Sequence, residues 1–577
     1  MAGKEERCYC SKAYQTHTSF LRHTRTCPAY SDDCRSFLRI LACIEPKPVP
    51  GDLFYRGTLP VRLWNDHGSE TLHRVFGLES IFENLNRLDK AIQSATSTAA
   101  VHTTLPTTAS AETGPRWAYH SFTLPQSSRN FIRSELSAQD YVVFPPLKRW
   151  ELETTKLVLH SFPLPDLDMN FLKQGQQLFP FLLPLLPDLP NKVLMNEIPY
   201  AIEVCLAATT FGSLPDKHLA LLTAKNLALR IAPTPLEGTI QLCEMRLDIL
   251  RTGHTAILHF SPNPGRKGNS QLAEFLLLRA QQLIERNNVH DAWSVLQRWV
   301  PENAAQPSTL EGILSSRMDL MKGKLCRYRG DFEGSLDYLV PLANQQPAPR
   351  ARFLCRLHLI AVFTELGLWD KGRALLDDTE AVTRQQQRLL QIARAEFHLA
   401  RGLSGFDTEL QSAKKLFINV SQQYEELQPG TRGMRRNYFR VCSGLAIIGH
   451  IRRRTWSDFG KIRAIGQWET AYRACRLGLM DGADVGFPDL ICLMSMAELK
   501  SSLPHNDQAA DLSRAQEIRS DLPRNSQRFL FTNLGTRWAN KLCEWLKESG
   551  NPEGLPSWYH LEGHDAGERG MRGEIIG

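Results

Sequence analysis

Residues 316–347 read SRMDLMKGKLCRYRGDFEGSLDYLVPLANQQP. Apolar residues recur at helical spacing on both sides of Gly330 and Asp331, and this pattern predicts two helices joined by a tight turn. Gly323 on the first helix and Ser335 on the second are small, so the two helices can approach closely. The segment is therefore predicted to be an antiparallel helical hairpin.

Three neighbouring segments carry fainter versions of the same hairpin: 273–301, 353–376 and 388–417. The turns predicted at positions 287, 330, 367 and 402 are 43, 37 and 35 residues apart. In the last segment we expect an insertion between Gly402 and Ala413. With Pro347 closing the quoted hairpin, the pattern resembles the tetratricopeptide family, which implies stacked hairpins that bind partner proteins. The predicted fold class is mainly α: an irregular α-helical, tetratricopeptide-like solenoid over 191–550, behind a small amino-terminal ββα unit.

That unit lies in residues 1–30. Twelve residues separate Cys10 from His23, and three separate His23 from Cys27. Thiolates and imidazoles are preferred zinc ligands, and so short a segment needs the metal in order to fold. The segment resembles a two-Cys two-His zinc finger of the variant that ends in cysteine. The resemblance implies a ββα fold that holds Zn²⁺ through Cys8, Cys10, His23 and Cys27.

The spacing departs from that family at one place. Only Tyr9 stands between Cys8 and Cys10, whereas the family has two to four residues there. His17 and Cys34 are therefore alternative ligands.

If the finger binds DNA as its relatives do, the resemblance places its base-reading side chains at Thr16, Ser19 and Arg22. Arg22 could form two hydrogen bonds with a guanine. A single finger covers about three base pairs. A second DNA-contacting surface, a dimer, or a protein-binding role for the finger is therefore needed.

The net charge of +7 is unevenly distributed. Between Arg432 and Arg463, nine basic residues stand against the single acid Asp458, so the rest of the chain sums to −1. The run Arg452, Arg453 and Arg454 leaves three interpretations open: a solvated helix face, a nuclear import signal or a nucleic-acid contact.

Composition divides the rest of the chain. We expect a small mixed connecting region at 31–93, a flexible Ser/Thr/Ala linker at 94–115, an aromatic and proline-rich region at 116–190 that leads into helices, and a disordered glycine-rich tail at 551–577. A helix is predicted to begin near Pro146. Near the end of the chain, an amphipathic helix carrying Trp538 and Trp545 is expected to dock on the solenoid.

Several classes of protein are disfavoured. The most apolar run, 179–190, is interrupted by four prolines, which argues against a membrane span. The first ten residues lack a signal-peptide core, and thirteen thinly spread cysteines indicate reduced thiols, so we expect a soluble intracellular chain. No phosphate-binding loop, dinucleotide fingerprint, HExxH or GxSxG motif occurs, so neither catalysis nor a small-molecule cofactor is expected. The segment PNPGRKGNS (262–270) is predicted to be a loop in which Ser270 caps the following helix.

Two functions follow from these features. The first is a nuclear transcriptional regulator that contacts DNA through the finger and partner proteins through the repeats. Its layout is similar to fungal regulators in which one atypical finger precedes a long helical region, which implies control of a specialised (secondary) metabolic gene cluster. The second is a cytoplasmic, non-catalytic adaptor whose repeats bind a peptide, with a finger that is structural or protein-binding.

Overall fold

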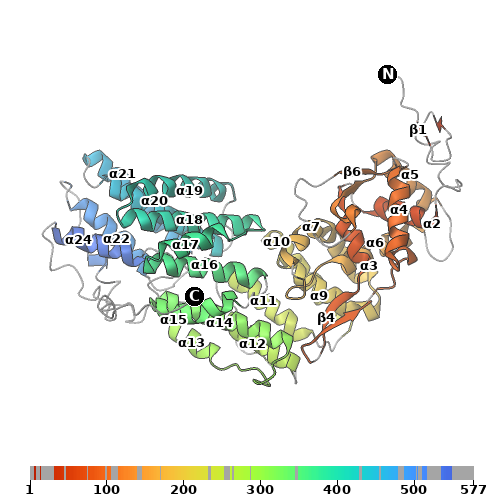
Figure 1. Ribbon diagram of the computed structural model, residues 1–577, viewed down its shortest axis with the longest axis horizontal. Coiled ribbons are helices and arrows are strands. Elements are labelled where there is room, and N and C mark those ends of the chain that lie inside the picture. Colours follow the sequence, from red (N-terminus) through yellow and green to blue (C-terminus); the bar gives the residue numbers. More distant parts are fainter. Residues whose placement is uncertain are drawn as a thin grey trace. The chain divides into compact units, whose positions relative to one another are not determined.

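The structure is a computed structural model (Figure 1). It describes residues 6–7, 13–14, 31–503 with gaps, part of 510–517, and 535–548; the longest gaps within 31–503 are 105–114, 139–145, 253–259 and 479–486. The chain divides into two compact units. The first unit comprises Met1–Leu247, Phe260–Leu272 and Glu302–Gly312, and the second comprises Asp248–His259, Ala273–Pro301 and Ile313–Gly577. The predicted boundary at residue 191 lies within the first unit, which includes residues 191–247.

At the amino terminus, two short strands pair. β1 (Glu6–Arg7) runs antiparallel to β2 (Ala13–Tyr14), with Glu6 opposite Tyr14. Residues 8–12 connect the two strands and, like 15–30, lie outside the described residues.

The first unit contains a small antiparallel sheet and a hairpin. The sheet has the order β3-β7-β6, formed by β3 (Val49–Pro50), β6 (His102–Thr104) and β7 (Ser121–Thr123). The hairpin pairs β4 (Val61–Trp64) with β5 (Glu70–His73).

This sheet corrects the predicted linker at 94–115. Residues 94–97 complete helix α4 (Leu85–Ser97), and 102–104 form β6. The segment is poor in large apolar residues, but β6 gains its order from backbone pairing with β7 rather than from burial of its own side chains. Residues 105–114 lie outside the described part of the chain.

Helices make up most of the rest of the first unit, and the last of them, α11, ends within the second unit. Besides α4 and four short 3₁₀ turns, the described helices of this part are α2 (Asp32–Cys43), α3 (Gly51–Thr58), α5 (Gln126–Ser137), α6 (Pro146–Ser161), α7 (Phe171–Leu182), α8 (Leu189–Lys192), α9 (Ile198–Ala208), α10 (Leu214–Leu229) and α11 (Glu237–Thr252). Helix α6 begins at Pro146, as predicted. The core is centred on the edge-to-face rings of Phe37, Phe54 and Phe122, whose centroids lie 5.0–5.9 Å apart.

The second unit is built of helices. They are α12 (Arg266–Glu285) and α14 (Thr309–Arg329), which both begin within first-unit residues, and α13 (Val289–Leu296), α15 (Phe332–Asn344), α16 (Pro349–Leu366), α17 (Trp369–Asp377), α18 (Arg384–Leu403), α19 (Asp407–Leu427), α20 (Arg432–Arg453), α21 (Asp458–Gly478), α22 (Phe487–Lys500) and α24 (Gly535–Glu548). The chain is thus mainly helical, and consecutive helices from α15 to α22 pack on one another (Figure 1).

The quoted hairpin forms as predicted, from α14 and α15. Gly330 makes the turn with a φ of 83°, a value that favours glycine. A Cβ added to Gly323 would lie 2.7 Å from side-chain carbons of Leu339, so the small residue permits the close approach of the helices. The Ser335 hydroxyl donates to the carbonyl of Gly323 at 2.8 Å and fixes the same contact. Pro347 lies outside the described residues.

Two local predictions are wrong. No insertion separates Gly402 from Ala413, because α19 begins at Asp407 immediately after the turn at Gly405. Ser270 does not cap a helix, because α12 already begins at Arg266. The amide of Asn269 donates to Glu311 at 3.0 Å, and this tertiary contact helps hold the additional turn in the helix.

The carboxy-terminal helix docks as predicted. Helix α24 packs on α22 and α18, with Trp538, Leu542 and Trp545 buried. Arg537 joins this helix to the turns of two hairpins, since its guanidinium donates to the carbonyls of Thr364 and Glu365 at 3.0 and 2.8 Å and to the Ser404 hydroxyl at 3.1 Å.

Candidate partner-binding site

The predicted ligands and base-reading residues of the finger lie outside the described part of the chain. This applies to the four ligands Cys8, Cys10, His23 and Cys27 and to the base-reading residues Thr16, Ser19 and Arg22. Among the described residues, no group of three or more His, Cys, Asp or Glu side chains could hold a metal ion.

Of the two alternative ligands, the structure describes Cys34 but not His17. Cys34 lies on α2 with none of its surface exposed. Burial raises the pKa of its thiol to about 11. The side chain of Cys34 thus belongs to the core of the first unit.

The basic stretch 432–463 is not one solvated face. Arg452 is half-buried on α20, while the side chain of Arg453 and the whole of Arg454 lie outside the described residues. Arg436 is also half-buried, and burial lowers its pKa to about 10. A run of charges says nothing by itself about which side chains a neighbouring helix will cover.

Arg440 shows this most clearly. Its Nε and one Nη donate to the two carboxylate oxygens of Glu396 on α18, at 2.8 and 2.6 Å. The Glu396 side chain is 3% exposed and the Arg440 side chain 20% exposed. Burial alone would lower the pKa of Arg440, but Glu396 more than offsets this and raises it. A bidentate ion pair of this kind fixes the relative orientation of the two side chains as well as pairing their charges.

Helix α14 contributes two more cations next to an aromatic ring. The guanidinium of Arg327 lies 4.7 Å and the ammonium of Lys324 5.4 Å from the ring centroid of Tyr328. Arg327 and Tyr328 are buried, whereas Lys324 is half-buried. Burial would raise the pKa of Tyr328, but Lys324 and Arg327 together lower it.

Helix α16 places two titratable groups in the same positive surroundings. The pKa of His358 lies well below its usual value because of burial and then because of Arg327, Lys324 and Arg440. Burial raises the pKa of Glu365 to about 8, although Arg537 and Arg327 oppose the shift. Oε1 of Glu365 is buried and accepts no hydrogen bond from the described residues.

These side chains form one group, which we call the inner polar cluster. Its members come from the first helix of each of four successive hairpins: Lys324, Arg327, Tyr328, His358, Glu396 and Arg440. Helix α16 packs on α18, and α18 on α20, so the first helices of the last three hairpins form one layer (Figure 1). Lys324 and Arg327 make the local potential positive, since both act to lower the pKa values of Tyr328 and His358.

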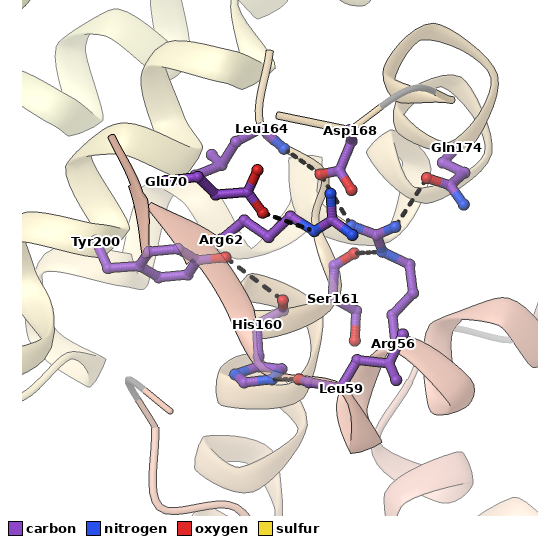
Figure 2. Close-up of polar contacts among 10 residues, drawn as sticks. All are labelled: Arg56, Leu59, Arg62, Glu70, His160, Ser161, Leu164, Asp168, Gln174 and Tyr200. Atoms are coloured by element: carbon purple, nitrogen blue, oxygen red, sulfur yellow. Dashed lines mark hydrogen bonds and ion pairs between the residues drawn. The ribbon is translucent and has the colours of Figure 1, made fainter. Parts of the chain in front are cut away.

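A second polar group, in the first unit, has a structural role. The guanidinium of Arg56 on α3 donates to the carbonyl of Ser161 at 2.6 Å, to Gln174 at 2.8 Å and to Asp168 at 3.1 Å (Figure 2). Asp168 also accepts from the backbone of Leu164 at 2.8 Å. These contacts tie α3 to α6, to the segment after it and to α7.

A cleft of about 540 Å³ also opens in the first unit. It lies between α4 and the segment 115–122, and its apolar lining includes Ile92, Trp117 and Phe122. At the polar edge of the cleft, the side-chain amide of Gln93 donates to the carboxylate of Asp89, one turn earlier on α4, at 2.8 Å.

Comparisons of the chain with protein-family models, with curated proteins and with solved structures found no match. Within the described residues, every helix is too short or too polar to cross a membrane.

Sequence reasoning missed most of the inner polar cluster. In the sequence, Arg440 stands out only as part of a basic run, and Glu396 and His358 belong to no recognisable motif. The sequence carries one signal for them: polar and charged residues recur on the first helix of successive hairpins, among the apolar residues that define each helix. Their mutual contacts depend on how the hairpins stack.

Proposed function

We propose that the chain is a transcriptional regulator in which an amino-terminal zinc finger contacts DNA and the helical hairpins bind a partner protein. The observation that carries the proposal is the Cys8, Cys10, His23 and Cys27 spacing, joined in one chain to a long array of helical hairpins. No enzyme motif competes with this interpretation in the sequence.

The strand pair at the amino terminus is compatible with the finger. β1 and β2 flank residues 8–12, so Cys8 and Cys10 belong to the connection between two antiparallel strands. A ββα finger carries its two cysteines at the same place. Three thiolates and one imidazole form a donor set that suits tetrahedral Zn²⁺, and the ion would supply the folding free energy of the segment.

The roles of the remaining predicted residues follow from the same proposal. Thr16, Ser19 and Arg22 would face the bases, with Arg22 the most selective of them. Arg452, Arg453 and Arg454 would serve nuclear import or add a nucleic-acid contact. Because one finger gives little specificity, we propose that partner binding by the hairpins directs the regulator to its genes, which would be a specialised metabolic cluster.

Chromatin occupancy mapping tests the proposal. The full chain is compared with Cys10→Ser and His23→Ala variants, and with Cys43→Ser as a control that removes a thiol outside the finger. We expect site-specific occupancy for the full chain and the control, and its loss in both finger variants. Absence of enrichment for the intact chain would overturn the DNA-contacting role.

A second candidate function, a cytoplasmic adaptor, is favoured by the inner polar cluster. The hairpins have a charged layer of their own, so a partner could bind without any contribution from the finger. The cellular location of a tagged chain separates the candidates, with and without Ala substitution of Arg452, Arg453 and Arg454. A native chain that accumulates in the nucleus and loses this accumulation on substitution supports the regulator. A native chain that is cytoplasmic supports the adaptor.

A further inference from the structure

The cleft beside α4, which we call the α4 cleft, lies wholly within the first unit and has two walls of different chemistry. On one wall, Asn86, Gln93 and Thr96 form a polar stripe along α4. The segment 115–122 forms the other wall. A volume of about 540 Å³ is typical of sites for small molecules, and such sites combine an apolar lining with a few polar groups.

The apolar part of the lining is held rigidly by the core. Ile92 and Phe122 are buried, and the ring of Phe122 packs edge-to-face on those of Phe37 and Phe54. Thr103 on β6 lies opposite Phe122 in the register of the sheet, so the two side chains are on the same face. A fixed apolar surface of this kind suits a flat ring.

Trp117 adds to this lining a hydrogen-bond donor that lacks an acceptor. Its Nε1 is buried and donates to no atom of the described residues. The buried indoles of Trp468 and Trp538 do donate, to Nδ1 of His450 at 3.1 Å and to the hydroxyl of Ser495 at 3.0 Å. A buried N–H group without an acceptor is unfavourable, so an acceptor atom of a ligand in the cleft would stabilise it.

Positive charge lies next to this donor. Arg116 is exposed, and its guanidinium makes no ion pair or hydrogen bond with the residues that the structure describes. The half-buried His120 belongs to the same wall. The carboxylate of Asp89 lies on the opposite wall, where it accepts from Gln93. An anionic group is therefore favoured on the side of Arg116 and Trp117.

We propose that the α4 cleft binds a small aromatic carboxylate. The ring lies against Ile92 and Phe122, and the carboxylate accepts hydrogen bonds from Nε1 of Trp117 and from the guanidinium of Arg116. This site goes beyond the proposed function, because it involves neither the finger nor the hairpins.

Isothermal titration calorimetry with the purified full chain tests the inference. The probe is 2-naphthoate, and its counterpart is 2-naphthamide, which keeps the ring and one acceptor oxygen but has no charge. We expect one molecule of 2-naphthoate to bind per chain with a Kd below about 1 mM. The amide should bind at least about tenfold more weakly, because it cannot form the charge-assisted hydrogen bonds.

Substitutions of the two donors locate the carboxylate. Arg116→Gln should weaken 2-naphthoate about tenfold. The matched control is Arg74→Gln, at an exposed position of the first unit that does not line the cleft, and it should have little effect. Trp117→Phe keeps an aromatic ring but removes the N–H group, and it should weaken binding about threefold to tenfold.

Filling the cleft gives an independent test. Thr103→Trp places a large ring in the cleft and should abolish binding. Thr104→Trp, at the next residue of β6, points to the other face of the sheet and should bind like the native chain. Thermal unfolding of each variant shows whether the fold is intact.

Three outcomes would overturn the inference: no binding of 2-naphthoate to the native chain, equal affinity for the acid and its amide, or equal affinities of the Arg116→Gln and Arg74→Gln chains. Binding that survives in a folded Thr103→Trp chain would also place the ligand elsewhere and overturn it.

Discussion

Trp468 determines which nitrogen of His450 carries a proton. The indole Nε1 of Trp468 can only donate a hydrogen bond, and it lies 3.1 Å from Nδ1 of His450, which must therefore accept. The proton of the neutral ring is then on Nε2, which donates to Glu498 at 2.7 Å. All three side chains are buried between α20, α21 and α22.

We expect Trp468→Phe to lower the free energy of unfolding by about 1–3 kcal/mol, because Nδ1 of His450 is left buried without its donor. Urea unfolding followed by circular dichroism measures the change. Trp293→Phe, at a half-buried position of α13, is the matched control and should lower the free energy of unfolding by less. Equal losses in the two variants would show that the hydrogen bond contributes nothing of its own.

The buried pair of Arg440 and Glu396 should be strongly coupled. Arg440→Met leaves the carboxylate of Glu396 buried without its partner and should cost about 3–5 kcal/mol. The double variant Arg440→Met with Glu396→Leu should recover much of that loss. A double-mutant cycle measures the coupling, and simple addition of the two single effects would contradict it.

Gly323 should be intolerant of any larger side chain. In Gly323→Ala, the new methyl group would lie 2.7 Å from carbons of Leu339, so we expect a loss of about 1–3 kcal/mol. The control is on the same helix: an added Cβ at Gly312 meets nothing within 4 Å, and Gly312→Ala should be neutral or stabilising by up to about 1 kcal/mol. Chemical unfolding of both variants decides, and a stable Gly323→Ala chain would argue against close packing of α14 on α15.

Glu365 should make stability fall as the pH rises. Burial raises its folded-state pKa from the ordinary 4.5 to about 8, with Arg537 and Arg327 opposing and Glu396 reinforcing the shift. Between these two values the folded chain binds a proton that the unfolded chain has released, so each rise in pH disfavours the fold. Glu365→Gln removes this penalty, and its stability relative to the native chain should increase from about pH 5 to about pH 8. Unfolding midpoints across this range measure the slope, with Glu333→Gln on α15 as the reference; parallel slopes would contradict the prediction.

The zinc content of the chain should depend on the predicted ligands. We expect about one zinc ion per full chain by elemental analysis, and near-complete loss in Cys10→Ser and in His23→Ala. Cys43→Ser should retain the metal. Cobalt substitution gives an independent readout, and a spectrum without tetrahedral thiolate bands would rule out the finger.

The sequence by itself determined the hairpins, because a hairpin is a local structure. Helical periodicity, the small residues Gly323 and Ser335 and the glycine at the turn act within about one repeat, so their spacing in the chain is enough to predict them. The same locality explains the correct start of α6 at Pro146. The strands β3, β6 and β7 escaped prediction because each has only two or three residues, too few to show an alternating pattern.

Only the tertiary structure decided the environment of the charges. Arg440 and Glu396 are 44 residues apart, and nothing in either local sequence indicates that α18 and α20 bring them together. The finger spacing is local as well, so the sequence could suggest its ligands. The inner polar cluster is not a local feature, because burial and electrostatic potential are properties of packed helices. The sequence of a basic run does not show which of its side chains the neighbouring helices will bury.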